Sequence, residues 1–370
     1  MGTEALAADT VLSGTLHVFV AFDWGEEVDL DRARRIVPAE VQGLARRPRT
    51  PPAFAYRPAP LRYRLGSVPL SLPELGVLFA DADATLFDFG AISTALRVPF
   101  HLTMPQLTRL AGWLAEPAEV VQASRTALTP LHERLRPALA KPDWRDDLSE
   151  EYLVFELPTG AALDPHTLLE THANWLAGLL LLDAGDLSEE EVADAVRLHI
   201  SYTPQDLLLA DWGAAVLVDS NCEETLQVIE FCNLQLLEFR YVDNRLDDIL
   251  TAAYRQIERL TRSWLPSWRA YTRPLRELGE LKVDANEVFE RTGNVLKLVG
   301  DQYLARVYRQ LADRFHLGEW EQSIERKLDT VEGVYKVLAD QAATARAELL
   351  EIIIVILILF EVIMAVVARH

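Results

Sequence analysis

The hexapeptide HVFVAF at residues 17–22 decides the fold class of the N-terminal half of this chain. Its β-branched and aromatic residues follow the alternation that is typical of a half-buried strand. A helical stretch opens after it at Leu30-Asp31. The same order returns 133 residues later, where the strand-like segment EYLVFEL (residues 151–157) precedes a helical stretch that opens at Leu163-Asp164. We interpret this recurrence as an internal duplication.

A matching pair of turn motifs supports the duplication. Asp88-Phe89-Gly90-Ala91 follows the first helical stretch and Asp211-Trp212-Gly213-Ala214 follows the second. Glycine permits the backbone dihedrals of a tight hairpin, so each motif predicts a hairpin turn. The order strand–helix–strand–strand–helix, twice, predicts an α+β fold with two ferredoxin-like units in tandem. We expect the first unit at residues 1–114, a linker at 115–150 and the second unit at 151–220.

Residues 221–348 are predicted to form a long helical hairpin, because apolar residues recur at spacings of three and four. A heptad seam near the end predicts a coiled coil, either within the hairpin or between copies of the chain. The seam consists of Ile324, Leu328, Val331, Tyr335, Leu338, Ala342, Ala345 and Leu349, and continues through Ile352, Ile356, Leu359, Ile363 and Val366.

The apolar stretch at residues 349–368 predicts a single C-terminal transmembrane helix. Nine consecutive large apolar residues, IIIVILILF, occupy positions 352–360, and a helix of twenty residues spans about 30 Å, one hydrocarbon thickness. Glu361 would cost about 2.5–3.5 kcal/mol inside the membrane, which the apolar residues around it outweigh. We expect it either to face another helix or to be protonated there. The chain would then be anchored in the cell (inner) membrane with its N-terminal domains in the cytoplasm, the alternative being a helix buried in a soluble oligomer.

Charge and cysteine content narrow the function classes. The chain of 370 residues has a net charge of −20, which disfavours non-specific nucleic-acid binding and gives no indication of a specific DNA partner. Two cysteines, Cys222 and Cys232, exclude a disulfide framework. Residues 31–64 nevertheless carry nine arginines and two acidic residues. A basic patch there could contact anionic lipids or ribosomal RNA, or could serve only solubility. Its candidate residues are Arg32, Arg35, Arg46, Arg47 and Arg49.

Catalytic and cofactor motifs are absent from the sequence. Neither phosphate-binding glycine motif occurs, and the Asp88-Phe89-Gly90 triplet lacks the other kinase signatures. Asp81-x-Asp83 favours a solvated loop over a cation site, and His166 and His172 lack the spacing of a zinc motif. We therefore expect no catalytic residues, no metal and no cofactor, although an enzyme is not excluded.

Three C-terminal segments carry a resemblance to a known family. They are Leu237–Asp243 (LEFRYVD), the pattern Asn294-x-x-Lys297-x-x-Gly300-Asp301-x-Tyr303-x-Ala305-Arg306-x-Tyr308, and Glu348–Glu351 with the apolar run that follows. In these segments the chain resembles the required-for-meiotic-nuclear-division family. The resemblance implies an α+β front, a helical back, a terminal membrane helix, oligomerisation and support of translation.

The second of these segments also predicts a polar cluster from spacing alone. Asn294, Lys297 and Asp301 lie three and four residues apart, so they share one helix face. The cluster is either a structural network between helices or a ligand site. Its candidate residues are Glu238, Arg240, Asp243, Asn294, Lys297, Asp301 and Arg306.

Together these features predict a membrane-anchored, homo-oligomeric scaffold or adaptor without catalytic activity, which supports translation or tethers a partner. Two alternatives stay open. One is a ligand sensor or enzyme with its site in the polar cluster. The other is a ribosome or RNA tether that uses the basic patch.

Overall fold

A computed structural model describes most of the chain. The described residues are 9–41, 58–261 and 302–367, with gaps at 26, 39, 146–147, 159–163 and 220–221, together with residues 276, 279, 280 and 283. The chain divides into two compact units. The first comprises Met1–Glu238 and Thr292–Gly318, and the second comprises Phe239–Arg291 and Glu319–His370.

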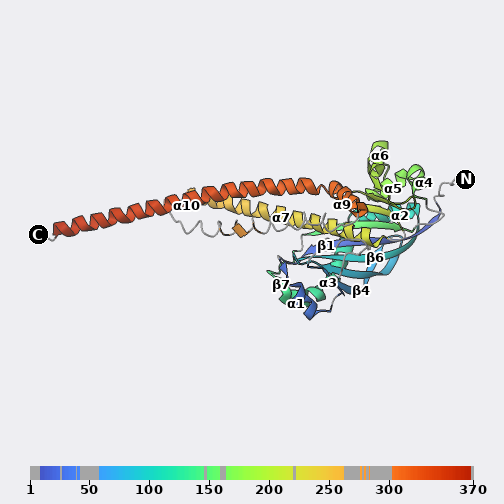
Figure 1. The fold of residues 1–370 in the computed structure, drawn as a ribbon, viewed down its shortest axis with the longest axis horizontal. Coiled ribbons are helices and arrows are strands. Elements are labelled where there is room, and N and C mark those ends of the chain that lie inside the picture. Colours follow the sequence, from blue (N-terminus) through green and yellow to red (C-terminus); the bar gives the residue numbers. More distant parts are fainter. Residues whose placement is uncertain are drawn as a thin grey trace. The chain divides into compact units, whose positions relative to one another are not determined.

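The first unit is built on one nine-stranded sheet (Figure 1). Its strand order is β3-β4-β5-β6-β1-β8-β11-β10-β9, and every pairing is antiparallel except that of β8 with β11. The central strand β1 pairs with β6 along its whole length, from Val11 opposite Thr103 to Asp23 opposite Ala91. The strands are β1 (Val11–Asp23), β3 (Glu40–Val41), β4 (Leu61–Leu72), β5 (Gly76–Leu86), β6 (Ala91–Thr103), β8 (Ser149–Leu157), β9 (His199–Ile200), β10 (Leu207–Ala210) and β11 (Ala214–Val218), with a separate pair β2 (Glu27–Val28) and β7 (Leu139–Ala140).

The two faces of this sheet differ in chemistry. Leu16, Val18, Val20 and Phe22 of β1 enter the hydrophobic core, together with buried residues of α2, α3 and α5. The alternate positions of β1, including His17, point to the opposite face. On that face lies the beginning of α7, where Asn233 donates a hydrogen bond to the Glu150 carbonyl oxygen at 3.0 Å. The sheet is therefore covered by an apolar layer on one side and by a partly polar contact on the other.

The helices of the first unit begin at capping residues that the sequence provides. Asp29 accepts a hydrogen bond from the Arg32 backbone N–H, and Asp164 does the same for Thr167. Thr103 and Gln106 form a capping box at the start of α2. The helices are α1 (Leu30–Ile36), α2 (Met104–Leu114), α3 (Ala118–Leu135), the 3-10 turn η2 (Arg136–Ala138), α4 (Pro165–Thr171), α5 (Ala173–Leu180), α6 (Glu189–Arg197), α9 (Gln302–Arg314) and the first part of α7 (Glu223–Thr261).

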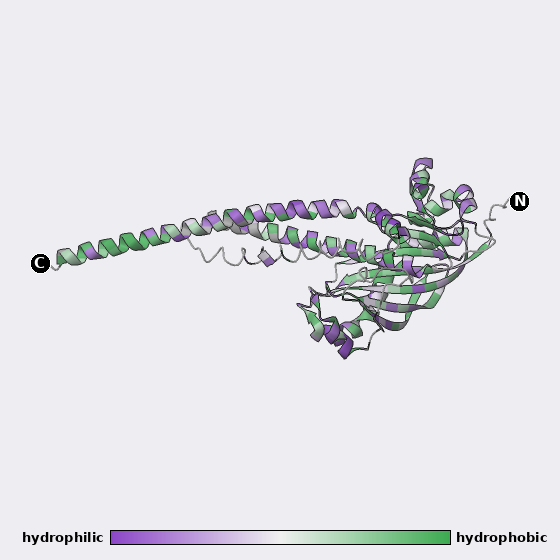
Figure 2. Ribbon diagram, in the orientation of Figure 1, coloured by the Kyte–Doolittle hydropathy of each residue, from purple (hydrophilic) through white to green (hydrophobic). Residues whose placement is uncertain are grey.

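The second unit contains the rest of α7 and nearly all of α10 (Leu317–Val367). Ile324 and Val331 of α10 are buried, as is Leu246 of α7. The Lys327 ammonium lies 2.7 Å from Asp243 Oδ1 and 2.8 Å from Asp247 Oδ1, so ion pairs join the two helices. The C-terminal part of α10 is almost entirely apolar in Figure 2.

The predicted pair of tandem ferredoxin-like units is wrong. The two strands that suggested a duplication, β1 and β8, are direct antiparallel neighbours, from Thr15 opposite Glu156 to Phe22 opposite Ser149. Because the two halves share one continuous ladder of hydrogen bonds, they form one sheet and not two. The predicted hairpin turns are confirmed, since Asp88–Gly90 joins β5 to β6 and Asp211–Gly213 joins β10 to β11.

The predicted transmembrane helix is also wrong. In the part of the chain that the structure describes, no helix is long and apolar enough to cross a membrane. Glu351 and Glu361 bound the uninterrupted apolar run at residues 352–360. Nine helical residues extend about 14 Å, less than half of a hydrocarbon layer of about 30 Å. The predicted single-pass anchor in the cell membrane is therefore not supported.

Candidate functional site

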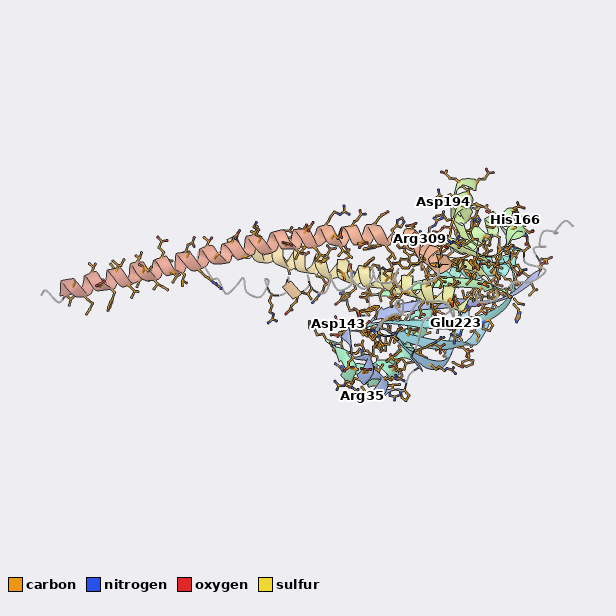
Figure 3. The ribbon with its side chains drawn as sticks, viewed as in Figure 1. Arg35, Asp143, His166, Asp194, Glu223 and Arg309 are labelled. Atoms are coloured by element: carbon orange, nitrogen blue, oxygen red, sulfur yellow. The ribbon has the colours of Figure 1, made fainter. Side chains whose placement is uncertain are left out.

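A polar pocket lies within the first unit, on the face of the sheet opposite the hydrophobic core. Its volume is about 420 Å³, within the range of small-molecule sites. Strands β1, β4, β5, β6 and β8 provide one wall, and the first two turns of α7 provide the other. Figure 3 labels Glu223, the first residue of α7. The lining residues are His17, Phe19, Arg62, Asp83, Thr85, Ala95, Arg97, Glu156, Cys222, Glu223, Leu226, Gln227 and Glu230.

Strand register brings these side chains together. His17 pairs with Arg97 across β1 and β6, and Arg97 pairs with Asp81 on β5. Asp83, two residues further along β5, points to the same face as Asp81 because side chains alternate along a strand. Polar residues that are far apart in sequence thus form neighbouring rows on one face of the sheet.

Two arginines converge on one carboxylate in this pocket. Arg62 Nη2 lies 2.7 Å and Arg97 Nη2 lies 2.6 Å from the same oxygen, Asp83 Oδ2. Burial raises the pKa of Asp83, but hydrogen bonds and charge from Arg97 and Arg62 outweigh it, and the net pKa is lowered. Asp83 is therefore ionised at neutral pH, and two positive charges share one negative charge.

A histidine and a second carboxylate form another pair. His17 Nε2 lies 2.6 Å from Glu156 Oε2. The hydrogen bond from His17 holds the pKa of Glu156 below its usual value, although burial opposes it. Burial raises the pKa of the neighbouring Cys222 thiol to about 12, with the charge of Glu156 adding to the effect. Cys222 therefore remains protonated at neutral pH, which is unfavourable for a nucleophile.

Glu230 is the acid of the pocket whose burial is least well offset by hydrogen bonds and positive charge. Its side chain comes from the second turn of α7, and the residue is only 7% exposed. Burial raises the pKa of Glu230 to about 7, an effect that Ser93, Arg62 and Thr85 offset only in part. In the described part of the chain, neither Glu230 Oε1 nor Ser93 Oγ makes a hydrogen bond of good geometry. A carboxyl group in such a position takes up or releases a proton near neutral pH.

The predicted polar cluster only partly falls within the described residues. Asn294, Lys297 and Asp301 lie outside them. Asp243 contacts Lys327, whereas Arg306 donates a hydrogen bond to the Ser201 carbonyl oxygen at 3.4 Å. The remaining members are Glu238, which is buried, and Arg240, whose pKa burial lowers. A ligand site formed by all seven residues stays a prediction.

The predicted basic patch also lies only partly within the described residues. Arg32 and Arg35 lie exposed on α1, where Figure 3 labels Arg35. Arg46, Arg47 and Arg49 lie outside the described residues. Arg62 belongs to the same arginine-rich window but points into the pocket. Among the described residues, no cluster of histidine, cysteine or acidic side chains could hold a metal ion.

Sequence reasoning missed the pocket residues, although one signal for them was present. The interpretation of Asp81-x-Asp83 as a solvated loop is wrong, since both residues lie on β5 and Asp83 is 7% exposed. A charged residue at a buried strand position requires a partner. That requirement pointed to arginines on neighbouring strands, but the sequence could not identify which strands those were.

Comparisons with known proteins place the first unit in a family. The sequence profile described as "Uncharacterized protein MJ0711, N-terminal domain" matches residues 13–224, more than half of the chain. The chain belongs to this family. The matched region begins in β1 and ends at the start of α7, so it contains every pocket residue named above except Glu230 and its neighbours Leu226 and Gln227.

One relative is a protein of Methanocaldococcus jannaschii. The chain is 27% identical over 205 residues to "Uncharacterized protein MJ0711" of Methanocaldococcus jannaschii. The alignment covers 55% of this chain and 62% of the relative, which is less than two thirds of the relative's length. No solved structure matches the chain.

These matches overturn the resemblance to the required-for-meiotic-nuclear-division family. The segments that carried the resemblance lie after residue 224, outside the region that defines the family. Leu237–Asp243 lies on α7 and Glu348–Glu351 lies on α10. Amphipathic helices of unrelated proteins share such spacings of apolar and charged residues, so the pattern was not specific.

Proposed function

We propose that this protein binds a small polar molecule in the pocket between the sheet and the start of α7. The observation that carries the proposal is the pocket itself, with about 420 Å³ of space beside buried charged side chains. A structural role alone does not require such space, because protein interiors are close-packed. The buried Oε1 of Glu230 has no hydrogen-bond partner among the described residues, and a polar ligand could provide one.

A variant that fills the pocket tests this proposal without removing a charge. Ala95 lines the pocket and is only partly buried, so Ala95→Phe places an aromatic ring in the ligand's space. Val77→Phe is the matched control, because Val77 is 79% exposed on β5 and does not line the pocket. We expect compounds from a metabolite library to raise the Tm of the wild-type chain and of Val77→Phe, but not that of Ala95→Phe. Equal shifts in all three proteins, or none in the wild type, would contradict the proposal.

A second proposed property is self-association through the C-terminal part of α10, which would make the protein a homo-oligomeric scaffold. The supporting observation is the exposure of the large apolar side chains there, which extends from 37% at Leu349 to 65% at Val367. An exposed apolar surface of this kind marks an interaction site or an aggregation liability. A second copy is the occupant we propose, because the heptad seam of α10 continues through this segment.

Paired glutamate substitutions test self-association against non-specific apolar attraction. Ile352→Glu with Ile356→Glu places two charges on the seam, whereas Ile354→Glu with Ile358→Glu places the same charges away from it. Sedimentation velocity should show that only the seam variant dissociates to monomers. An equal loss in both variants, or a monomeric wild type, would exclude seam-specific association.

A further inference from the structure

We infer that the pocket accepts a small organic oxyanion, held by Arg62 and Arg97, and that Glu230 takes up a proton when this anion binds. This inference rests on the ligand-binding function proposed above and names the chemical class of the ligand. A carboxylate or phosphoryl group provides the required chemistry.

The arginine pair provides the anion subsite. Each guanidinium carries five N–H donors. In the described part of the chain, each of these two groups makes a single hydrogen bond, through Nη2 to Asp83 Oδ2. The side chains of Arg62 and Arg97 are 29% and 34% exposed and line the pocket, so their remaining donors have access to its interior. Fork-shaped donors of this kind match the oxygens of carboxylates and phosphates.

The other acids of the pocket do not cancel this positive charge. Asp83 neutralises one of the two arginines and leaves an excess of one. Glu156 Oε2 is engaged by His17 Nε2 at 2.6 Å, on the neighbouring strand. Glu223 lines the pocket but is exposed, so water screens its charge.

Glu230 is the acid that an incoming anion would meet in its charged form. It lines the same pocket as both arginines and responds to the charge of Arg62 and of Asp83. A carboxylate and a bound anion repel each other at short range, and the repulsion is strong in a buried site. Proton uptake by Glu230 from solvent removes this repulsion and leaves a neutral carboxyl that donates a hydrogen bond to the ligand.

The charged and titratable groups around Glu230 come from every element that borders the pocket. They are His17 on β1, Arg62 on β4, Asp83 on β5, Arg97 on β6, Glu156 on β8, and Cys222 and Glu223 at the start of α7. The pKa values of Asp83 and Glu156 are lowered and that of Cys222 is raised to about 12. These three groups therefore keep their charge state around neutral pH, and Glu230 is the acid whose charge changes there.

Three ligands of one shape test the charge class. Benzoate, benzamide and benzamidine are an anion, a neutral molecule and a cation of nearly equal size, and each ring offers apolar contact to Phe19. Titration calorimetry on the full chain at pH 6 and pH 8 measures the three affinities. We expect benzoate to bind best, and about tenfold more tightly at pH 6 than at pH 8, because the fraction of protonated Glu230 falls about tenfold around a pKa of about 7. Inorganic phosphate, as a fourth probe, separates a phosphoryl preference from a carboxylate preference.

Substitutions of Glu230, Arg97 and Arg62 test the role of each residue in ligand binding. Glu230→Gln should bind benzoate equally at both pH values, because glutamine cannot ionise. Arg97→Gln should weaken the affinity for benzoate about tenfold or more at both pH values and leave the affinity for benzamide unchanged. We expect the same result for Arg62→Gln, whose arginine lies on a second strand. Arg109→Gln is the matched control, since Arg109 pairs with Glu74 on the surface and does not line the pocket.

The outcomes separate this inference from the ligand-binding proposal. If benzamide or benzamidine binds more tightly than benzoate and phosphate, the pocket binds ligands but the oxyanion assignment is refuted. Equal benzoate affinity at pH 6 and pH 8 in the wild type would refute proton uptake by Glu230. If none of the probes, and no library compound, binds the wild type, the ligand-binding function itself fails.

Discussion

Replacing Glu230 with glutamine should stabilise the protein at high pH and have much less effect at low pH. In the unfolded chain the carboxyl has its usual pKa of about 4.5, whereas in the folded chain burial raises its pKa to about 7. The folded state therefore binds more protons between these values, so the free energy of unfolding falls as the pH rises from 4.5 to 7 and is constant above that. This difference in pKa corresponds to about 3 kcal/mol in total, most of which falls between pH 5 and pH 8.

Urea unfolding at pH 5, 6, 7 and 8, followed by tryptophan fluorescence, measures this effect. Titration of groups far from Glu230 cancels in the difference between Glu230→Gln and wild type. That difference should become more favourable to the variant by about 2–3 kcal/mol across the series. Glu74→Gln is an opposite-sign control, because the hydrogen bond from Arg109 lowers the pKa of Glu74. Its substitution should destabilise the chain by an amount that stays constant from pH 5 to pH 8. A Glu230→Gln difference that stays constant from pH 5 to pH 8 would refute the reasoning, since it would mean that Glu230 ionises alike in both states.

Three further predictions concern packing and charge. Gly14→Ala should destabilise the first unit by about 1–3 kcal/mol in urea unfolding, because the new Cβ would collide with the Glu156 carbonyl oxygen and would lie 2.6 Å from Phe100 Cζ. The same substitution at Gly333 should instead stabilise α10 by about 1 kcal/mol, because no described neighbour lies within 4 Å of the added Cβ and alanine favours the helix. A loss at Gly333 would contradict the helical assignment. Asp83→Asn should cost about 1–3 kcal/mol, because it weakens two charge-assisted hydrogen bonds, and an unchanged urea midpoint would mean that the arginines do not depend on Asp83.

Local structure followed closely from local sequence in several segments. The alternation at residues 17–22 predicted a strand that the structure extends to Val11–Asp23. The helix predicted to open at Leu30-Asp31 begins there but ends at Ile36, because the backbone at Val37 is extended. The heptad pattern from Ile324 onwards predicted a continuous helix, and α10 runs to Val367. Side-chain periodicity and caps act over a few residues, which is why they can be read without a partner.

Pairing between strands could not be predicted in the same way. The similarity of residues 17–22 and 151–157 suggested two separate units, whereas these segments lie side by side as β1 and β8. A strand pattern specifies which face is buried but not which strand is its neighbour. For the same reason the sequence placed the candidate site on helical segments, and not in the pocket of the first unit.

The amino-acid sequence by itself determined the strand at HVFVAF, the two hairpin turns and the long terminal helix, because each depends on interactions within a few residues. Only the tertiary structure decided that Arg62, Asp83, Arg97 and Glu230 share one pocket. These side chains come from three strands and a helix that are up to 168 residues apart, counted from Arg62 to Glu230. Their neighbourhood, and with it the raised pKa of Glu230, arises from long-range pairing and burial.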